Sequence, residues 1–259
     1  MCLITGRLHF YRANFIFSGK DKINLGNYSI KSFALSEDKE DVLLTLSNDK
    51  TMSIAGAAQD EVLIRDANGK SNSYAKMVFY DNGVLLNKGK RPTEATVSSG
   101  ATGYVAGNSI KKVYVTGGVS GIEITAGNNK TTLDASEAGG VTLKGGAKND
   151  KLIGSTVASA VDTFVYSGGK DVIENYVAGE QIVFDGDNLK LEDAKIAVSK
   201  KSLKFKFSGS KNALTLKGNT TIKSAKIGDE TYTFSKNAFG KGENVTLTNA
   251  FSGTYKVAK

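Results

Sequence analysis

Large aliphatic residues recur at an almost constant interval in the middle of the chain. Five of them are separated by 9, 9, 10 and 9 positions: Val115, Ile124, Leu133, Leu143 and Leu152. Each belongs to a short strand-like stretch that is followed by a turn rich in glycine, asparagine or other small residues. One such unit cannot bury its own apolar side chain, whereas stacked units can. The interval therefore predicts a coil of short strands over residues 105–185.

Apolar and polar residues alternate on both sides of this coil, as is typical of half-buried strands. Residues 42–54 predict a hairpin with its turn near Asn48-Asp49, and residues 203–216 repeat the pattern. Ser47 matches Ser208 at an offset of 161, and Ile23 matches Ile182 at an offset of 159. These offsets predict two related spacer segments. The chain then divides into a ragged N-terminus or tail of a preceding module (1–17), a first β-rich spacer (18–104), the coil (105–185) and a second spacer (186–259).

Composition agrees with an all-β fold. The chain of 259 residues contains 29 glycines, one proline and no tryptophan, and no long window has a helical period. We therefore predict a short parallel β-roll or β-solenoid flanked by two related β-sheet spacer modules. Because the pattern begins and ends within a module, we expect the chain to be a slice of a longer array with neighbouring repeats.

One turn of the coil contains a recognisable motif. Residues 145–153 read Gly-Gly-Ala-Lys-Asn-Asp-Lys-Leu-Ile, an imperfect copy of G-G-x-G-x-D-x-U-x, in which U is a large apolar residue. Lys148 replaces the third glycine, and the four preceding units have no aspartate at the position of Asp150. Residues 162–182 continue with Asp-Thr-Phe-Val-Tyr, a Gly-Gly turn, Lys-Asp-Val-Ile, Tyr and Gly-Glu-Gln-Ile. Together these residues resemble the end of a hemolysin-type (RTX) calcium-binding repeat block.

This resemblance implies calcium binding. In that family, glycine-rich turns supply carbonyl oxygens and the motif aspartates supply carboxylates, which suits an ion that prefers six to eight oxygen ligands. The resemblance assigns these ligand positions in this sequence: Asp150, Asp162, Asp171, Gly145, Gly146 and Asn149. It also implies an exported protein that is extracellular or on the bacterial cell surface. Glu180, Asp185 and Asp187 follow the coil, and we interpret them as turn and surface carboxylates rather than ligands.

The sequence gives little support for other chemistry. Cys2 and His9 are the only cysteine and histidine, and both lie in a stretch without a clear pattern, so we expect no enzyme. The net charge is +8, but lysines alternate with apolar residues, as in 203–207, which is typical of a solvated strand face. We expect affinity for acidic polymers or cell surfaces and no specific nucleic-acid site. No run of about 18 apolar residues predicts a membrane span.

Three functions remain open at this point. The favoured one is a non-enzymatic calcium-binding repeat segment of an exported bacterial protein, in which calcium stabilises the β-roll. The second is a structural or adhesive surface repeat that folds without calcium, which the missing aspartates and the basic charge favour. The third is an accessory region of a larger secreted hydrolase.

Overall fold

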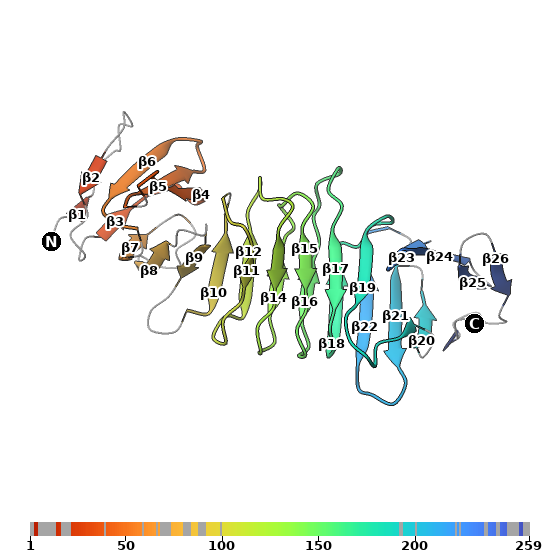
Figure 1. The fold of residues 1–259 in the computed structure, drawn as a ribbon. Coiled ribbons are helices and arrows are strands. Elements are labelled where there is room, and N and C mark those ends of the chain that lie inside the picture. Colours follow the sequence, from red (N-terminus) through yellow and green to blue (C-terminus); the bar gives the residue numbers. More distant parts are fainter. Residues whose placement is uncertain are drawn as a thin grey trace. The chain divides into compact units, whose positions relative to one another are not determined.

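The computed structural model describes residues 3–4, 14–16, 22–38, 40–58, 60–65, 67, 74–79, 84–87, 92–98, 100–191, 194–199, 201–220, 222, 224–235, 238–241, 244–247 and 254–255. The chain divides into two compact units. Unit 1 comprises residues 1–104 and 113–119, and unit 2 comprises residues 105–112 and 120–259. The described residues form strands and turns without an α-helix, so the all-β prediction is confirmed (Figure 1). Accordingly, no helix in this part of the chain is long and apolar enough to cross a membrane.

The strands are short, and their bounds in chain order are β1 Leu3–Ile4, β2 Asn14–Ile16, β3 Lys22–Asn24, β4 Ile30–Leu35, β5 Val42–Leu46, β6 Thr51–Ala55, β7 Glu61–Arg65, β8 Ala75–Phe79, β9 Val84–Asn87, β10 Glu94–Val97, β11 Tyr104–Val105, β12 Lys112–Val115, β13 Glu123–Thr125, β14 Thr132–Asp134, β15 Thr142–Lys144, β16 Lys151–Ile153, β17 Thr163–Tyr166, β18 Lys170–Glu174, β19 Gln181–Phe184, β20 Ala194–Val198, β21 Ser202–Phe207, β22 Ala213–Lys217, β23 Ser224–Ile227, β24 Glu230–Ser235, β25 Ala238–Lys241, β26 Asn244–Leu247 and β27 Thr254–Tyr255.

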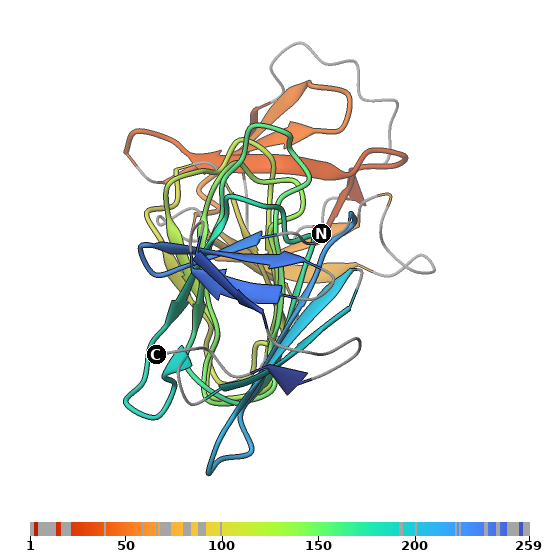
Figure 2. The same ribbon diagram turned by 90° about the vertical axis from the view of Figure 1, so that its right-hand side faces the viewer.

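Unit 2 contains the predicted coil except for residues 113–119, which belong to unit 1. The odd-numbered strands β13, β15, β17 and β19 pair in parallel, and so do the even-numbered strands β14, β16 and β18. One turn of the coil therefore consists of two strands, and Ile124 lies opposite Leu143 one turn later. Seen in Figure 2, successive turns of this part follow one another as superimposed loops. The arrangement is a β-solenoid, as the 9-residue interval predicts.

The coil buries the residues that define its interval. Ile124, Leu133, Leu143 and Leu152 are all 0% exposed, while the residues beside them in each strand are partly exposed. Towards the end of the coil, aromatic side chains replace aliphatic ones. The ring centroids of Tyr166 and Phe207 lie 5.6 Å apart in a stacked arrangement. Phe207 belongs to an additional element that joins the coil at this point.

That element is an antiparallel meander inserted between two turns. β20, β21 and β22 pair antiparallel in chain order, and β22 then stacks in parallel on β18. After the meander the chain returns to the other sheet, where β23 stacks in parallel on β19. β23 to β26 continue as a second antiparallel meander. The two strands β20 and β21 are thus inserted into the coil, and parallel pairing continues after them with β22 and β23.

Unit 1 has the same strand plan. β2 pairs in parallel with β6 and β3 with β7, while β4, β5 and β6 form an antiparallel meander. β7 to β10 then pair antiparallel in chain order. The predicted hairpin near Asn48-Asp49 is the β5–β6 pair, and Asp49 has a φ of 61°, a conformation that aspartate tolerates at turns. The hydrophobic core of unit 1 includes Leu44, Leu46 and Ile54, all at most 1% exposed.

Candidate functional site

Four carboxylates are buried at the two corners of the unit 2 coil, where turns lead into strands. They are Asp150, Asp162, Asp171 and Glu180, each at most 3% exposed. Asp150 and Asp171 are one turn apart at the entry to β16 and within β18. Asp162 and Glu180 are one turn apart before β17 and β19. The coil period therefore creates two carboxylate pairs, one for each sheet.

The first corner is formed by Asp150 and Asp171. Thr131 donates its backbone N–H to Oδ1 of Asp150 over 2.7 Å, and Gly146 donates to Oδ2 over 2.8 Å. Asp150 in turn donates its own N–H to Oδ1 of Asp171 over 2.7 Å. Each carboxylate thus accepts a hydrogen bond from the turn before it, which connects neighbouring turns at their corners.

One oxygen in this corner has no donor. Oδ2 of Asp171 is buried and has no hydrogen-bond partner among the described residues. It lies against Gly145, where a Cβ atom would meet it at 2.6 Å. Gly146 has a similar restriction, because a Cβ there would lie 2.8 Å from the carbonyl oxygen of Gly127. The two motif glycines are therefore required by close packing of turns.

The second corner repeats this arrangement with Asp162 and Glu180. Val141 donates its N–H to Oδ1 of Asp162 over 3.0 Å, and Ser155 donates to Oδ2 over 2.6 Å. Val177 donates its N–H to Oε2 of Glu180 over 2.7 Å. The two carboxyl groups also affect each other's protonation: Glu180 lowers the pKa of Asp162, and Asp162 raises the pKa of Glu180.

Burial dominates the protonation of these groups. Loss of hydration raises the pKa of Asp150 and Asp162, against the opposing effect of the N–H donors. Burial, together with the charge of Asp150, raises the pKa of Asp171 to about 8. Burial likewise raises the pKa of Glu180 to about 8, with Asp162 as the neighbouring charge. Each corner therefore contains one carboxyl group, Asp171 or Glu180, that holds its proton near neutral pH.

The donor arrangement decides how well calcium fits. Both oxygens of Asp150 and of Asp162 already accept backbone N–H groups. Within the described ranges, no group of three or more His, Cys, Asp and Glu side chains is placed to hold a metal ion. These carboxylates therefore act as hydrogen-bond acceptors for the turns. Oδ2 of Asp171 is the buried oxygen of the first corner that remains available to a cation.

The predicted ligand residues are divided between the corners. Asp150, Asp171, Gly145 and Gly146 lie together in the first corner, and Asp162 lies in the second. Asn149 is on an exposed turn, where its Oδ1 accepts the backbone N–H of Lys170 over 2.9 Å. The three aspartates therefore do not form one set, because alternate units of the coil belong to opposite sheets.

Sequence reasoning missed the role of Glu180, which it assigned to the surface. The signal was present in the spacing, because Glu180 follows Asp162 by 18 residues, close to one full turn of the coil. Asp185 is exposed as expected and pairs with Lys144 at 2.7 Å. Cys2 and His9 lie outside the described residues.

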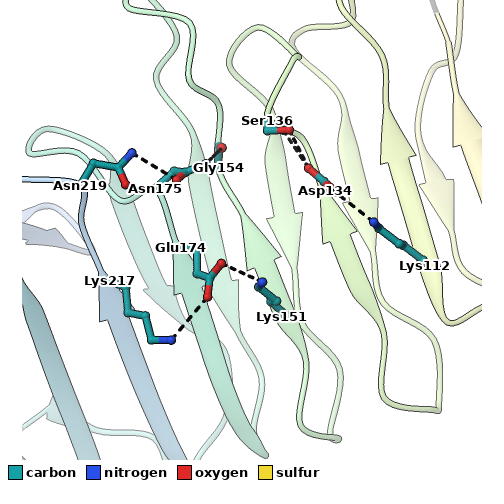
Figure 3. Close-up of polar contacts among 9 residues, drawn as sticks. All are labelled: Lys112, Asp134, Ser136, Lys151, Gly154, Glu174, Asn175, Lys217 and Asn219. Atoms are coloured by element: carbon teal, nitrogen blue, oxygen red, sulfur yellow. Dashed lines mark hydrogen bonds and ion pairs between the residues drawn. The ribbon is translucent and has the colours of Figure 1, made fainter.

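The outer face of the even-numbered strands carries a separate polar network. Glu174 on β18 accepts an ion pair from Lys151 at 2.7 Å and another from Lys217 at 3.4 Å (Figure 3). Lys112 and Asp134 form a further pair at 3.8 Å. These side chains point outward, away from the buried corners, and such exposed pairs contribute little to stability.

Comparison with known proteins gives no family. No protein-family model matches the sequence, and a search of curated protein sequences finds no match. Among solved structures, the extracellular lipase LipA from Serratia marcescens aligns with 80% of this chain at 14% identity and a TM-score of 0.24. The chain covers 32% of that lipase chain. A likeness this weak identifies neither a family nor an activity, and the β-solenoid assignment rests on the strand pairing of the chain itself.

Proposed function

We propose that the chain is a non-enzymatic structural repeat segment of an exported bacterial protein, and that its β-solenoid folds without calcium. The observation that carries the proposal is the chain of hydrogen bonds through the buried carboxylates. Asp150 and Asp162 each connect two turns with both of their oxygens, as a bound ion would otherwise do. Export and a cell-surface or extracellular location are part of the proposal and rest on the sequence resemblance.

The test is to follow folding with and without calcium. The purified chain in a chelator is expected to give a β-type far-UV circular dichroism spectrum and a cooperative thermal transition. Adding calcium should change neither the spectrum nor the melting temperature. Asp150→Ala should lower the melting temperature under both conditions, because it leaves the N–H groups of Thr131 and Gly146 without their acceptor. A chain that is unfolded in chelator and folds on calcium addition would contradict this proposal.

A second candidate is calcium binding at the first corner. It is supported by Oδ2 of Asp171, a buried oxygen without a donor next to the carboxylate of Asp150. Two adjacent buried carboxylates disfavour a second negative charge, and a divalent cation would relieve that repulsion. This candidate predicts a calcium-specific heat and a higher melting temperature, which magnesium does not produce.

Two variants separate the candidates. Asp171→Asn keeps the size of the side chain and removes its charge, whereas Asp187→Asn makes the same change at an exposed position. Under the second candidate, the calcium effect disappears in Asp171→Asn and persists in Asp187→Asn. If neither variant alters the response to calcium, the first corner is not the site of any calcium effect.

A further inference from the structure

The positive charge of the chain is concentrated in one segment. Residues 194–228 contain nine lysines and no acidic residue, and acidic pairs flank them at Glu192-Asp193 and Asp229-Glu230. The whole chain has 34 basic and 26 acidic residues, so the rest of it has 25 basic and 26 acidic residues. Without this segment the protein would carry almost no net charge.

The fold places several of these lysines on one face of the inserted meander. On β20 and β21, apolar residues such as Ile196, Leu203 and Phe205 point inward and are 0% exposed. Lys195, Lys204 and Lys206 alternate with such residues and are exposed. We call these three lysines, with Lys170 of β18, the lysine face.

Strand pairing aligns the lysine face into a row. Lys195 on β20 lies directly opposite Lys206 on β21. Lys206 lies opposite Ala213 on β22, and Ala213 lies opposite Lys170 on β18. With neighbouring strands about 4.8 Å apart, the row extends over roughly 15 Å. Lys204 adds a further charge two residues from Lys206 on the same strand.

In the described part of the chain, no acidic side chain is paired with the lysines of β20 and β21, which are Lys195, Lys204 and Lys206. Glu174, the acidic residue that points outward from β18, is already paired with Lys151 and Lys217. Like charges directly opposite each other destabilise a strand pair. The folding of the meander therefore does not explain why Lys195 faces Lys206.

Unit 1 provides an internal comparison. Its β4–β5–β6 meander has the same pairing, and its register places Leu43 and Thr45 at the positions of Lys204 and Lys206. The corresponding residues 31–65 contain four basic and seven acidic residues. The strand plan is thus compatible with a neutral outer face, and the lysine face is a property of unit 2 alone.

We propose that the lysine face binds a linear acidic polysaccharide. A row of lysine charges suits a polymer that carries a carboxylate or sulfate on successive sugars. Single-stranded nucleic acids are usually held by aromatic stacking and arginine as well as by charge. Here Phe205 and Phe207 are buried on the opposite side of the strand, and residues 194–228 contain no arginine. Charge is therefore the main contact that this face offers, with small and hydroxyl side chains between the lysines.

The test compares two triple variants by titration calorimetry with polygalacturonate and heparin at low salt. Lys195→Gln, Lys204→Gln and Lys206→Gln together remove three charges from the lysine face. Lys111→Gln, Lys130→Gln and Lys148→Gln together remove three exposed charges elsewhere in unit 2. The first variant should bind roughly a hundredfold more weakly, because each lysine near an anionic surface contributes about a fivefold gain in affinity. The second should change affinity by less than about threefold.

The salt dependence and the polymer comparison complete the test. The slope of log affinity against log salt should be about three smaller for the lysine-face variant, because each lysine releases about one counterion. Dextran, a neutral polymer, should not bind. Equal losses in both triple variants would overturn the proposal, since net charge would then explain the binding. Tighter binding to short duplex or single-stranded DNA than to either polysaccharide, or no binding at all, would overturn it as well.

Discussion

At the residue scale, the coil depends on side chains that replace missing contacts at its corners. A turn leaves backbone N–H groups that cannot pair with the next strand, and burying them without a partner is costly. Asp150 and Asp162 accept two such groups each. The motif aspartate therefore has a structural role in this chain as an acceptor for the backbone N–H groups of the turns.

The same corners predict how stability depends on pH. The pKa of Asp171 rises from 3.8 to about 8, and that of Glu180 rises from 4.5 to about 8. At pH values between the ordinary pKa of these groups and their raised pKa, the folded chain binds more protons than the unfolded chain. The free energy of unfolding should therefore fall as pH rises from about 5 to about 8. Glu174 has a lowered pKa, and its effect is confined to pH values below about 4.5.

Urea denaturation at pH values from 5 to 8 measures how the free energy of unfolding depends on pH. Asp171→Asn should show a smaller slope of unfolding free energy against pH than the parent chain, because one of the two titrating groups is gone. A free energy of unfolding that increases from pH 5 to pH 8 would show that the buried carboxyls do not hold their protons.

Close packing of turns gives a second prediction at this scale. A Cβ atom at Gly140 would lie 2.5 Å from the carbonyl oxygen of Val161, which cannot rotate away. Gly140→Ala should therefore lower the free energy of unfolding by about 1–3 kcal/mol. Gly107→Ala is the matched control, because nothing lies within 4 Å of its Cβ position. Equal effects of the two substitutions in urea denaturation would contradict the packing argument.

At the element scale, the inserted meander combines a fixed inner face with a variable outer face. Leu203, Phe205 and Phe207 in unit 2 occupy the positions of Val42, Leu44 and Leu46 in unit 1, and all six are buried. The outward positions between them differ in charge. The inner pattern determines the pairing, and the outer residues are free to change.

The lysine face predicts opposite effects on stability and binding. Lys206→Glu places an acidic residue directly opposite Lys195, where the parent chain has like charges. The melting temperature should rise, by an amount equivalent to about 0.5–1 kcal/mol at low salt, while polysaccharide binding weakens. Lys206→Gln serves as the control and should give a smaller rise. A lower melting temperature in Lys206→Glu would indicate that the lysines do not repel each other.

Sequence patterns predicted the elements better than their chemistry. The spacing of Ile124, Leu133, Leu143 and Leu152 was sufficient for the coil, because each fills the same place in successive half-turns. The role of the buried carboxylates was harder to predict from the sequence, because it depends on which backbone N–H groups lie one turn away. Glu180 was missed because it lies in a different kind of turn from the nonapeptide motif. The lysines were interpreted one strand at a time, and the row from Lys195 to Lys170 exists only after the strands are paired.

At the scale of the whole molecule, charge is distributed unevenly along a repeated plan. The positive segment 194–228 and its counterpart 31–65 have the same strand order and opposite net charge. Repulsion among exposed lysines is screened by salt, whereas the buried carboxyl pairs are affected much less. Ionic strength should therefore act mainly on unit 2.

This asymmetry predicts that moderate sodium chloride raises the melting temperature of the chain. Screening weakens the repulsion within the lysine face, and few exposed ion pairs are lost in exchange. The variant with Lys195→Gln, Lys204→Gln and Lys206→Gln should gain less from salt than the parent chain in the same differential scanning calorimetry series. A melting temperature that falls with added salt would mean that attractive surface pairs outweigh the lysine repulsion.

The return of β22 to β18 after the meander has a practical consequence for protein engineering. The coil does not need its two sheets to be joined by short turns, because a strand that re-enters in register restores the parallel pairing. Foreign loops or small binding peptides could therefore be grafted at the exposed turn of residues 208–210 without changing the hydrogen-bond pattern of the scaffold.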